Sequence, residues 1–295
     1  MRLRHWQAIL LAIAVGHAGS ARGQSGTLPV GTSAPIAGVG YRISIDSADA
    51  ARRTIRVVMT FTVESTQPVL LALPAWTPGS YELSYWAKYV SGFAATGGGK
   101  PLAWDKADYQ TWRVRPNGAG PVAVSFEYRN DPLDNSNSWS QPDFALLNGA
   151  NLFPYPAGRP FDFASTVELR LPAAWRVATG MTPSGRNTFT APNYHDLVDM
   201  PIVAGRFDFD STRVGDGWLR FASYPASVES ATRRASTLAD LAKIIPVESA
   251  VFGETPWHTY TVMQIADSAF AAIVGLEHRT SHVDLTSVFA LGSPV

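Results

Sequence analysis

The sequence of 295 residues contains no cysteine. This absence excludes a cysteine nucleophile, a thiolate metal site and any disulfide bond. The G-x-S-x-G elbow of serine hydrolases is also missing. Charged residues make up only 16% of the chain, with 24 basic against 24 acidic residues. The composition therefore predicts no nucleic-acid partner, which would need clustered lysine and arginine.

Long hydrophobic runs are missing too. The apolar run of residues 8–15 is much shorter than the roughly 20 residues that cross a bilayer. It follows Arg2 and Arg4 and precedes a small-x-small sequence at residues 21–23, so we predict a cleaved secretory signal peptide over residues 1–23. We expect a secreted or periplasmic protein with no membrane attachment after cleavage; an uncleaved anchor is the alternative. Cleavage removes three arginines and no acidic residue, which leaves 21 basic and 24 acidic residues, a net charge of −3.

Most of the remaining chain alternates between apolar and polar residues. Residues 24–40 are rich in Gly, Ser, Thr and Pro and predict a flexible lead-in. Two-residue alternation then predicts half-buried antiparallel strands, with apolar positions at Tyr41, Ile43, Ile45, Ile55, Val57, Met59, Phe61, Val63, Val122, Val124, Phe126, Tyr128, Val167, Leu169 and Leu171. Gly and Pro clusters separate these segments, so we predict a β-sandwich domain over residues 41–212.

The periodicity changes near residue 213. Apolar residues recur at spacings of three and four between Val228 and Ile245, which predicts a helix, and Pro246 is expected to end or kink it. Residues 259–265 then predict a strand. The fold class is therefore mainly β, an antiparallel β-sandwich followed by an α+β domain over residues 213–295. This second domain is short for its type and is expected to be incomplete.

Two segments resemble known kinds of site, a phosphate loop and a catalytic carboxylate pair, but neighbouring residues argue against both. Gly97-Gly98-Gly99-Lys100 is followed by Pro101, where a phosphate loop needs Ser or Thr, so a turn between strands is expected. Asp196 and Asp199 could form a carboxylate pair for glycoside chemistry. The alternative is a loop in which these aspartates bind backbone amides.

The sequence WTPGSY at residues 76–81 is the densest aromatic turn. Proline and glycine at Pro78-Gly79 favour β-turn geometry. Trp76, Tyr81, Tyr85 and Trp86 could form a sugar-binding platform, or they could cover the edge of the sandwich.

The sequence GLEHRTSH at residues 275–282 places His278 and His282 four residues apart. On a helix this spacing could bind a metal ion, but Arg279 replaces the glutamate that would act as base, and the alternation favours an extended segment. A metal pair and a solvated or hydrogen-bonded pair both remain open. Glu277 could be buried against Arg279 or a backbone amide.

Five segments in order resemble the glycyl aminopeptidase family of bacterial zinc metallopeptidases. They are LPAWTPGSY (73–81), TWRV (111–114), YHDLVDMPIVAGRF (194–207), VFGETPWHTY (251–260) and GLEH (275–278). The resemblance implies an N-terminal β-sandwich, a thermolysin-like catalytic domain that binds zinc and often a C-terminal PDZ domain. It also implies a peptide substrate with a free N-terminus.

The resemblance assigns substrate binding to Glu277, Gly275, Leu276 and His278. In such a family the G-L-E-H strand lies along the substrate, so Glu277 would bind the α-ammonium by a charge-assisted hydrogen bond. Gly275 would permit close backbone approach, and the backbone of Gly275 and Leu276 could pair with the peptide as an added strand.

Two departures from the family pattern are evident. Val274 stands where another glycine is usual, and no H-E-x-x-H occurs in the sequence. We therefore expect no catalytic residue and no bound zinc in this chain, a truncated and inactive N-terminal portion of such an enzyme. A non-enzymatic exported β-sandwich module that binds peptide or carbohydrate is the alternative.

Overall fold

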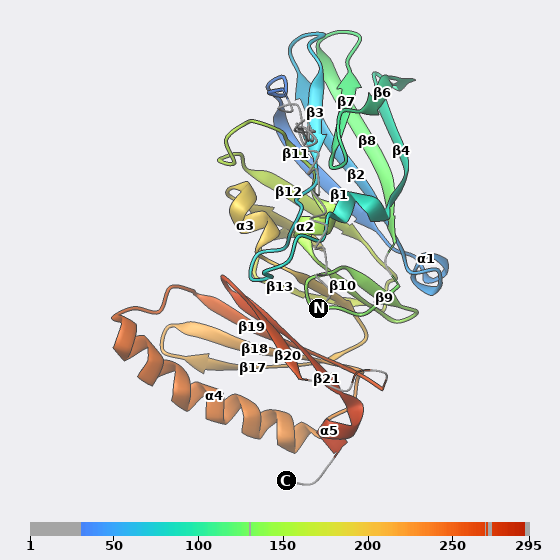
Figure 1. Ribbon diagram of the computed structural model, residues 1–295. Coiled ribbons are helices and arrows are strands. Elements are labelled where there is room, and N and C mark those ends of the chain that lie inside the picture. The colour runs from blue at the N-terminus through green and yellow to red at the C-terminus, as the bar shows by residue number, and fades with distance from the viewer. Residues whose placement is uncertain (1–30, 130, 269, 271–272, 293–295) are drawn as a thin grey trace, which may run out of the picture.

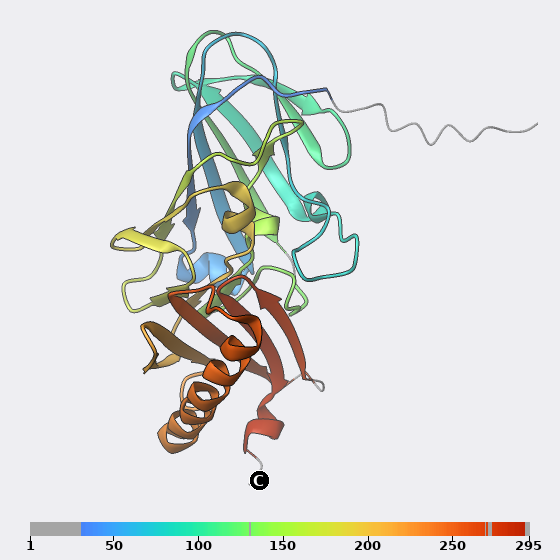
Figure 2. The same ribbon diagram turned by 90° about the vertical axis from the view of Figure 1, so that its left-hand side faces the viewer.

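A computed structural model describes residues 31–129, 131–268, 270 and 273–292. The predicted signal peptide lies outside the described residues. The described chain forms a β-sandwich stacked on a second, five-stranded sheet, with one long helix on the far side of that sheet (Figures 1 and 2).

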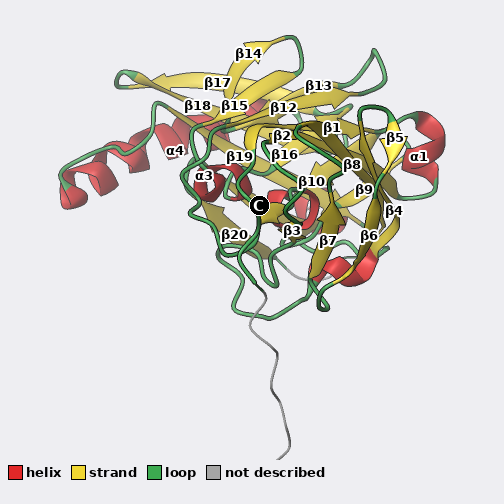
Figure 3. Cartoon of the chain, turned by 90° about the horizontal axis from the view of Figure 1, so that it is seen from above, coloured by secondary structure: helices red, strands yellow, loops and turns green. Residues whose placement is uncertain are grey.

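The sandwich is built from one large sheet and two smaller ones (Figure 3). The large sheet contains, in spatial order, β14 (Thr182–Gly185), β15 (Thr188–Ala191), β12 (Ser165–Arg170), β1 (Ala37–Ser44), β2 (Thr54–Val63), β8 (Gly120–Arg129), β4 (Val90–Gly97) and β5 (Lys100–Pro101). One four-stranded sheet contains β13 (Arg176–Thr179), β16 (Ile202–Gly205), β10 (Phe144–Leu147) and β9 (Trp139–Gln141). The other contains β11 (Tyr155–Pro156), β3 (Val69–Ala72), β7 (Thr111–Arg115) and β6 (Ala103–Lys106).

The five-stranded sheet, called the second sheet from here on, is mixed. Its order is β17 (Asp208–Val214), β18 (Gly217–Tyr224), β19 (Thr259–Asp267), β21 (Ser281–Ser287) and β20 (Val274–His278). The pairs β18/β19 and β19/β21 are parallel. The helices are α1 (Ser47–Ala51), the 3-10 helix η1 (Trp86–Tyr89), α2 (Gly149–Leu152), α3 (Tyr194–Val198), α4 (Ala231–Phe252) and α5 (Val288–Gly292).

The alternation in the sequence explains the sandwich core. In β2, Ile55, Val57, Met59, Phe61 and Val63 are buried, Val58 is partly buried, and Arg56, Thr60 and Thr62 are exposed. The buried side chains pack with apolar residues of both four-stranded sheets in one continuous core. The mainly β fold with an N-terminal sandwich is thus confirmed, and Gly98 and Gly99, both with positive φ, form the predicted turn between β4 and β5.

A second core joins the sandwich to the five-stranded sheet. The sheet β13-β16-β10-β9 buries Phe144, Leu146 and Val203 against Met263 and Leu285 of the second sheet. The far face of the second sheet packs on α4 through a smaller cluster around Leu238. The five-stranded sheet is therefore covered by the sandwich on one side and by α4 on part of the other.

The described residues differ in detail from two local predictions. The predicted lead-in over residues 24–40 is not flexible throughout, because β1 begins at Ala37 and Ser33 is buried, with its hydroxyl accepting from Leu70 N. The helix α4 does not end at Pro246, which lies inside it. Its end is set by Gly253, whose left-handed conformation lets its N–H bond to Ser249 O.

The predicted domain division at residue 212 stays a prediction; the first strand of the second sheet, β17, begins at Asp208. Within the described residues, no helix is long and apolar enough to cross a membrane.

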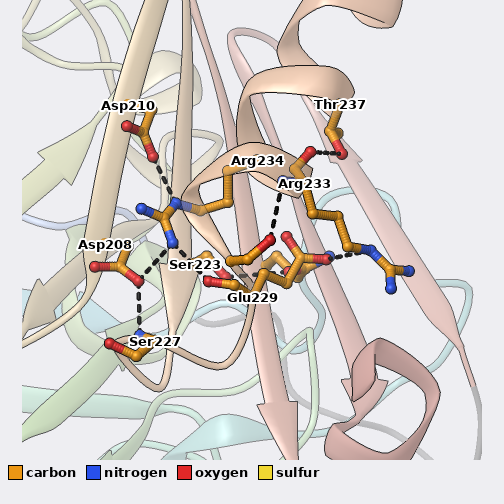
Figure 4. A network of polar contacts seen from close by, with 10 residues as sticks. Asp208, Asp210, Ser223, Ser227, Glu229, Arg233, Arg234 and Thr237 are labelled. Carbon is orange, nitrogen blue, oxygen red and sulfur yellow. Dashed lines mark hydrogen bonds and ion pairs between the residues drawn. The ribbon is translucent and has the colours of Figure 1, made fainter. Parts of the chain in front are cut away.

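A polar cluster holds α4 on the second sheet (Figure 4). The guanidinium of Arg234 pairs with Asp208 at 2.9 Å and Asp210 at 2.6 Å on β17, and it also donates to Glu229 O at 2.7 Å. Burial raises the pKa of Glu229, whose side chain is almost fully enclosed. The two ion pairs of Arg234 connect β17 to the first turn of α4, which indicates a structural role.

Candidate functional site

The strand β20 carries the GLEH sequence and lies at the edge of the second sheet. Among the described strands it pairs with β21 alone, with Glu277 opposite His282 and Gly275 opposite Asp284. The pair His278/Ser281 closes a two-residue turn. Since backbone groups of successive residues point to opposite sides of a strand, Gly275 and Glu277 direct their N–H and C=O groups to the outer edge.

The β20–β21 hairpin has two unlike faces. The docked face lies against the sandwich and contains Leu276, His278, Ser281, Val283 and Leu285, all buried. The open face carries Gly275, Glu277, His282 and Asp284, which are exposed or partly exposed, together with the neighbouring Tyr260 of β19.

The carboxylate of Asp199 holds the docked face of the hairpin on the sandwich. Asp199, directly after α3, lies 2.9 Å from His278 Nδ1 and accepts a hydrogen bond from the backbone N of Arg279 at 3.1 Å. The Arg279 guanidinium donates to Asp196 at 2.6 Å. The side chain of His278 is fully buried. The turn of the hairpin is therefore held on the sandwich by side chains of the Tyr194–Asp199 segment.

Close packing supports the same contact. A Cβ added at Gly180 would lie 1.9 Å from Thr280 Oγ1, so only glycine leaves room for the hairpin turn there. Residues 194–198, expected as a loop, form the short helix α3, whose N-cap Asn193 accepts from Asp196 N. Asp199 binds a backbone amide as predicted, but its second partner is a histidine side chain from the second sheet.

The turn at residues 76–81 lies against the edge strand. Gly79 has φ of +83°, and a Cβ there would lie 2.8 Å from Leu276 Cδ1 and 3.1 Å from Glu277 O. Ser80 N donates to Thr77 O, and the buried Thr77 hydroxyl donates to Ser136 O. The turn therefore reaches the outer edge of β20 at the carbonyl of Glu277.

The aromatic residues of this segment do not all cover the sandwich edge. Only Trp86 is buried; Trp76 is 51% exposed, Tyr85 is 43% exposed and Tyr81 is fully exposed. The expected covering role is wrong for Tyr81, whereas Trp76 and Tyr85 cover the sandwich only in part.

The open face is a polar cluster around Glu277. Glu277 is exposed, and no described residue forms a hydrogen bond or ion pair with its carboxylate. Tyr260 Oη lies 3.2 Å from His282 Nδ1, and His282 Nε2 lies 3.1 Å from Asp284 Oδ2. Burial raises the pKa of Tyr260 to about 12, and the charges of Asp284 and Glu277 add to this shift. A cationic group reaching this face would meet two carboxylates.

The hypothesis of a histidine pair that binds metal is wrong for this geometry. His278 faces the sandwich and His282 faces the opposite side, so their rings cannot meet one ion. Among the described residues, no group of three or more His, Asp or Glu side chains could hold a metal. The residues present thus do not fit a zinc site. The alternative in which Glu277 is buried against Arg279 is also wrong, because Arg279 binds Asp196.

The sequence predicts the extended segment that forms β20, but it does not predict the contacts that hold β20 on the sandwich. The sequence suggests a carboxylate pair or backbone amides as the partners of Asp199, whereas its side-chain partner His278 lies 79 residues later in the chain. Tyr260 gave no signal beyond its position in a predicted strand. No spacing in the sequence could have indicated either contact.

Comparison with known proteins agrees with this architecture. A crystal structure of an aminopeptidase N family protein from Idiomarina loihiensis matches with a TM-score of 0.78 and 26% identity, covering 86% of this chain and 43% of that chain. An M1 zinc metallopeptidase from Deinococcus radiodurans, a mutant bound to a Tyr-Ser-Ala substrate, gives a TM-score of 0.47 at 16% identity, covering 90% of this chain and 64% of that one. The chain thus spans less than half of the first structure.

No curated protein matches the chain in sequence. Residues 41–206 match the Peptidase M61 N-terminal domain, which is more than half of the chain. The chain belongs to the peptidase M61 N-terminal domain family.

Proposed function

We propose that this chain is the N-terminal portion of an exported, glycyl aminopeptidase-like zinc metallopeptidase, and that β20 holds the amino end of a peptide. Membership of the M61 N-terminal domain family supports a peptidase. The signal-like residues 1–23 support export. In this proposal the chain binds peptide without cleaving it, in keeping with a sequence that contains no H-E-x-x-H.

The observation that carries the proposal is the free carboxylate of Glu277 on an edge strand. An α-ammonium group bound there would form a charge-assisted hydrogen bond, which is shorter and stronger than a neutral one. Asp284 on the same face adds a second negative charge. Gly275 directs its backbone groups to the outer edge of β20, where an extended peptide can add to the sheet, while the turn at Gly79 occupies the edge at Glu277 O.

The other proposed site residues act from the docked face. The side chain of Leu276 packs against the turn at Gly79, and His278 is held by Asp199. Neither side chain is accessible to a peptide, so their part is to fix the backbone of β20 at the position where Glu277 projects from the open face.

The test is a peptide titration followed by NMR of this chain. We expect Gly-Gly-Gly with a free N-terminus to bind, and N-acetyl-Gly-Gly-Gly to bind at least about tenfold more weakly, because acetylation removes the charge. Glu277→Gln should abolish this difference, whereas Glu64→Gln, at an exposed site in the sandwich, should preserve it. Equal binding of both peptides by the unaltered chain would refute the role of Glu277. Turnover of glycyl or alanyl anilides with added zinc would refute the absence of catalysis.

One observation favours a second candidate, an exported module that binds carbohydrate. Tyr85 lies 5.9 Å from Tyr109 in an edge-to-face pair, and the rings of Tyr85, Tyr109 and Trp76 are all exposed. Exposed aromatic rings can stack on sugar rings. Oligosaccharides that shift the Trp76 indole resonance, with no response to Gly-Gly-Gly, would favour this function over the first.

A further inference from the structure

A cavity of about 770 Å³ lies on the outer face of the large sheet. Its lining includes Ser44 at the end of β1, Arg56 on β2, Arg170 at the end of β12 and Arg186 in the turn between β14 and β15. These strands follow one another in the sheet (Figure 3). Every residue that lines the cavity belongs to the sandwich, so the cavity is separate from the candidate site on β20.

The strand register brings three arginines to this cavity. Ser44 lies opposite Arg56 of β2 and opposite Arg170 of β12. Paired residues of neighbouring strands project from the same face about 5 Å apart, so one arginine flanks Ser44 on each side. The third is Arg186, whose turn is held beside β12 because Asn187 O accepts a backbone hydrogen bond from that strand at 2.8 Å.

The three arginines keep hydrogen-bond donors that are not used. A guanidinium group has five N–H donors. Arg56 binds its carboxylate partners through Nη2, and Arg170 pairs with Glu168 through Nη2 at 2.8 Å. The Nε and Nη1 groups of Arg56 and Arg170 donate to no described residue, and Arg186 forms no hydrogen bond or ion pair with any described residue. Donors of all three side chains are therefore available to a ligand.

The carboxylates that line the cavity are already occupied. Glu168 accepts from Arg42 Nε at 2.7 Å with one oxygen and pairs with Arg170 through the other. Asp46 accepts from a backbone N–H with one oxygen and from Arg56 with the other. The charged residues of the lining are three arginines and two acids. The unused donors and the surplus positive charge select an anion that presents several acceptor oxygens.

A phosphate monoester fits this set of donors. The guanidinium fork matches the oxygens of a carboxylate or a phosphate. A carboxylate has only two oxygens, whereas the phosphate of a monoester presents three and carries a charge of about −1.5 to −2 at pH 7. The cavity is larger than a phosphate group alone requires, and Leu171 and Pro172 add an apolar wall for the organic part of an ester.

The lining favours a soluble ester over a lipid. Proteins that bind a membrane surface place large apolar side chains in the lipid. Among the described residues, none of the exposed large apolar side chains lines this cavity.

We propose that the chain binds a soluble phosphate monoester in this cavity. Arg56, Arg170 and Arg186 hold the phosphate above Ser44, and the organic part lies against the apolar wall. This site is distinct from the proposed peptide site on β20 and does not depend on it.

The test is a titration of this chain with phenyl phosphate, followed by NMR. We expect binding at millimolar concentration or below, with shifts of the Arg170 and Arg186 Nε–H resonances, and no binding of phenol. Arg170→Gln and Arg186→Gln should each weaken binding by about tenfold, because each removes a charge-assisted hydrogen bond. Arg113→Gln, which removes an arginine that pairs with Asp105 on β6, is the matched control and should bind as the unaltered chain does.

Three results would overturn the proposal. The first is the absence of any shift of the Arg170 and Arg186 resonances at millimolar phenyl phosphate. The second is an equal loss of affinity in Arg113→Gln and Arg186→Gln, which would show attraction to the overall charge rather than to this cavity. The third is binding to vesicles that contain phosphatidic acid without binding of phenyl phosphate, which would assign the phosphate to a lipid. Titration with Gly-Gly-Gly tests the peptide site separately, and Arg186→Gln should leave that binding unchanged.

Discussion

The two faces of the β20–β21 hairpin differ in almost every physical respect. The docked face is buried and mainly apolar, with Asp199 binding His278. The open face carries Glu277, His282 and Asp284, which form few contacts with the described residues and stay accessible to solvent. A fold needs only one of these faces for stability. We infer from this difference that the docked face positions β20 and that the open face is available for a ligand.

Leu285→Ala on the docked face should cause the largest loss of stability. Leu285 is fully buried in the core between the sandwich and the second sheet. Removing its side chain leaves a cavity, and we expect a loss of about 2–5 kcal/mol in the free energy of unfolding. Urea denaturation measures it. Val247→Ala, at an exposed position of α4, is the control and should change stability little. A small loss for Leu285→Ala would mean that the docked face does not stabilise the hairpin.

Asp199→Ala should have the next largest effect. The change leaves the buried His278 Nδ1 and the Arg279 N–H without their acceptor, at a cost of about 1–3 kcal/mol. Hydrogen exchange should increase at β20 and the hairpin turn more than in β2. Asp216→Ala, an exposed aspartate between β17 and β18, is the matched control. Unchanged exchange at β20 would show that Asp199 does not fix the strand.

The sequence predicts the strands of the molecule better than the contacts that hold the docked face in place. Two-residue alternation identified the sandwich strands and the extended setting of residues 275–282, because burial of one face imposes that period. It could not identify the pairing of Asp199 with His278, because that contact depends on how two sheets stack. Pro246 does not end α4 for a related reason: packing of Leu238 and Leu241 and the cap at Gly253 outweigh one missing backbone hydrogen bond.

Raising the pH should destabilise the open face. An unfolded tyrosine has a pKa near 10, and the pKa of Tyr260 is raised to about 12 in the folded chain. Its contribution to stability is complete below pH 10 and is lost as the pH rises through about 12, since the unfolded phenol ionises first. Tyr260→Phe should reduce the alkaline loss of stability by about 1 kcal/mol. Denaturation midpoints across this pH range measure it, and an identical loss in the variant would contradict the shift.

Glu277→Gln should have the smallest effect on stability. Its carboxylate lies on the open face beside Asp284, and no described residue pairs with it, so the folded chain gains nothing from the charge. We expect a change within about 0.5 kcal/mol, as for other exposed substitutions. A clear loss of stability would show that Glu277 has a structural partner and would remove the basis for its proposed role. If unfolding is unchanged while binding of Gly-Gly-Gly is lost, the carboxylate serves the ligand and the docked face alone serves the fold.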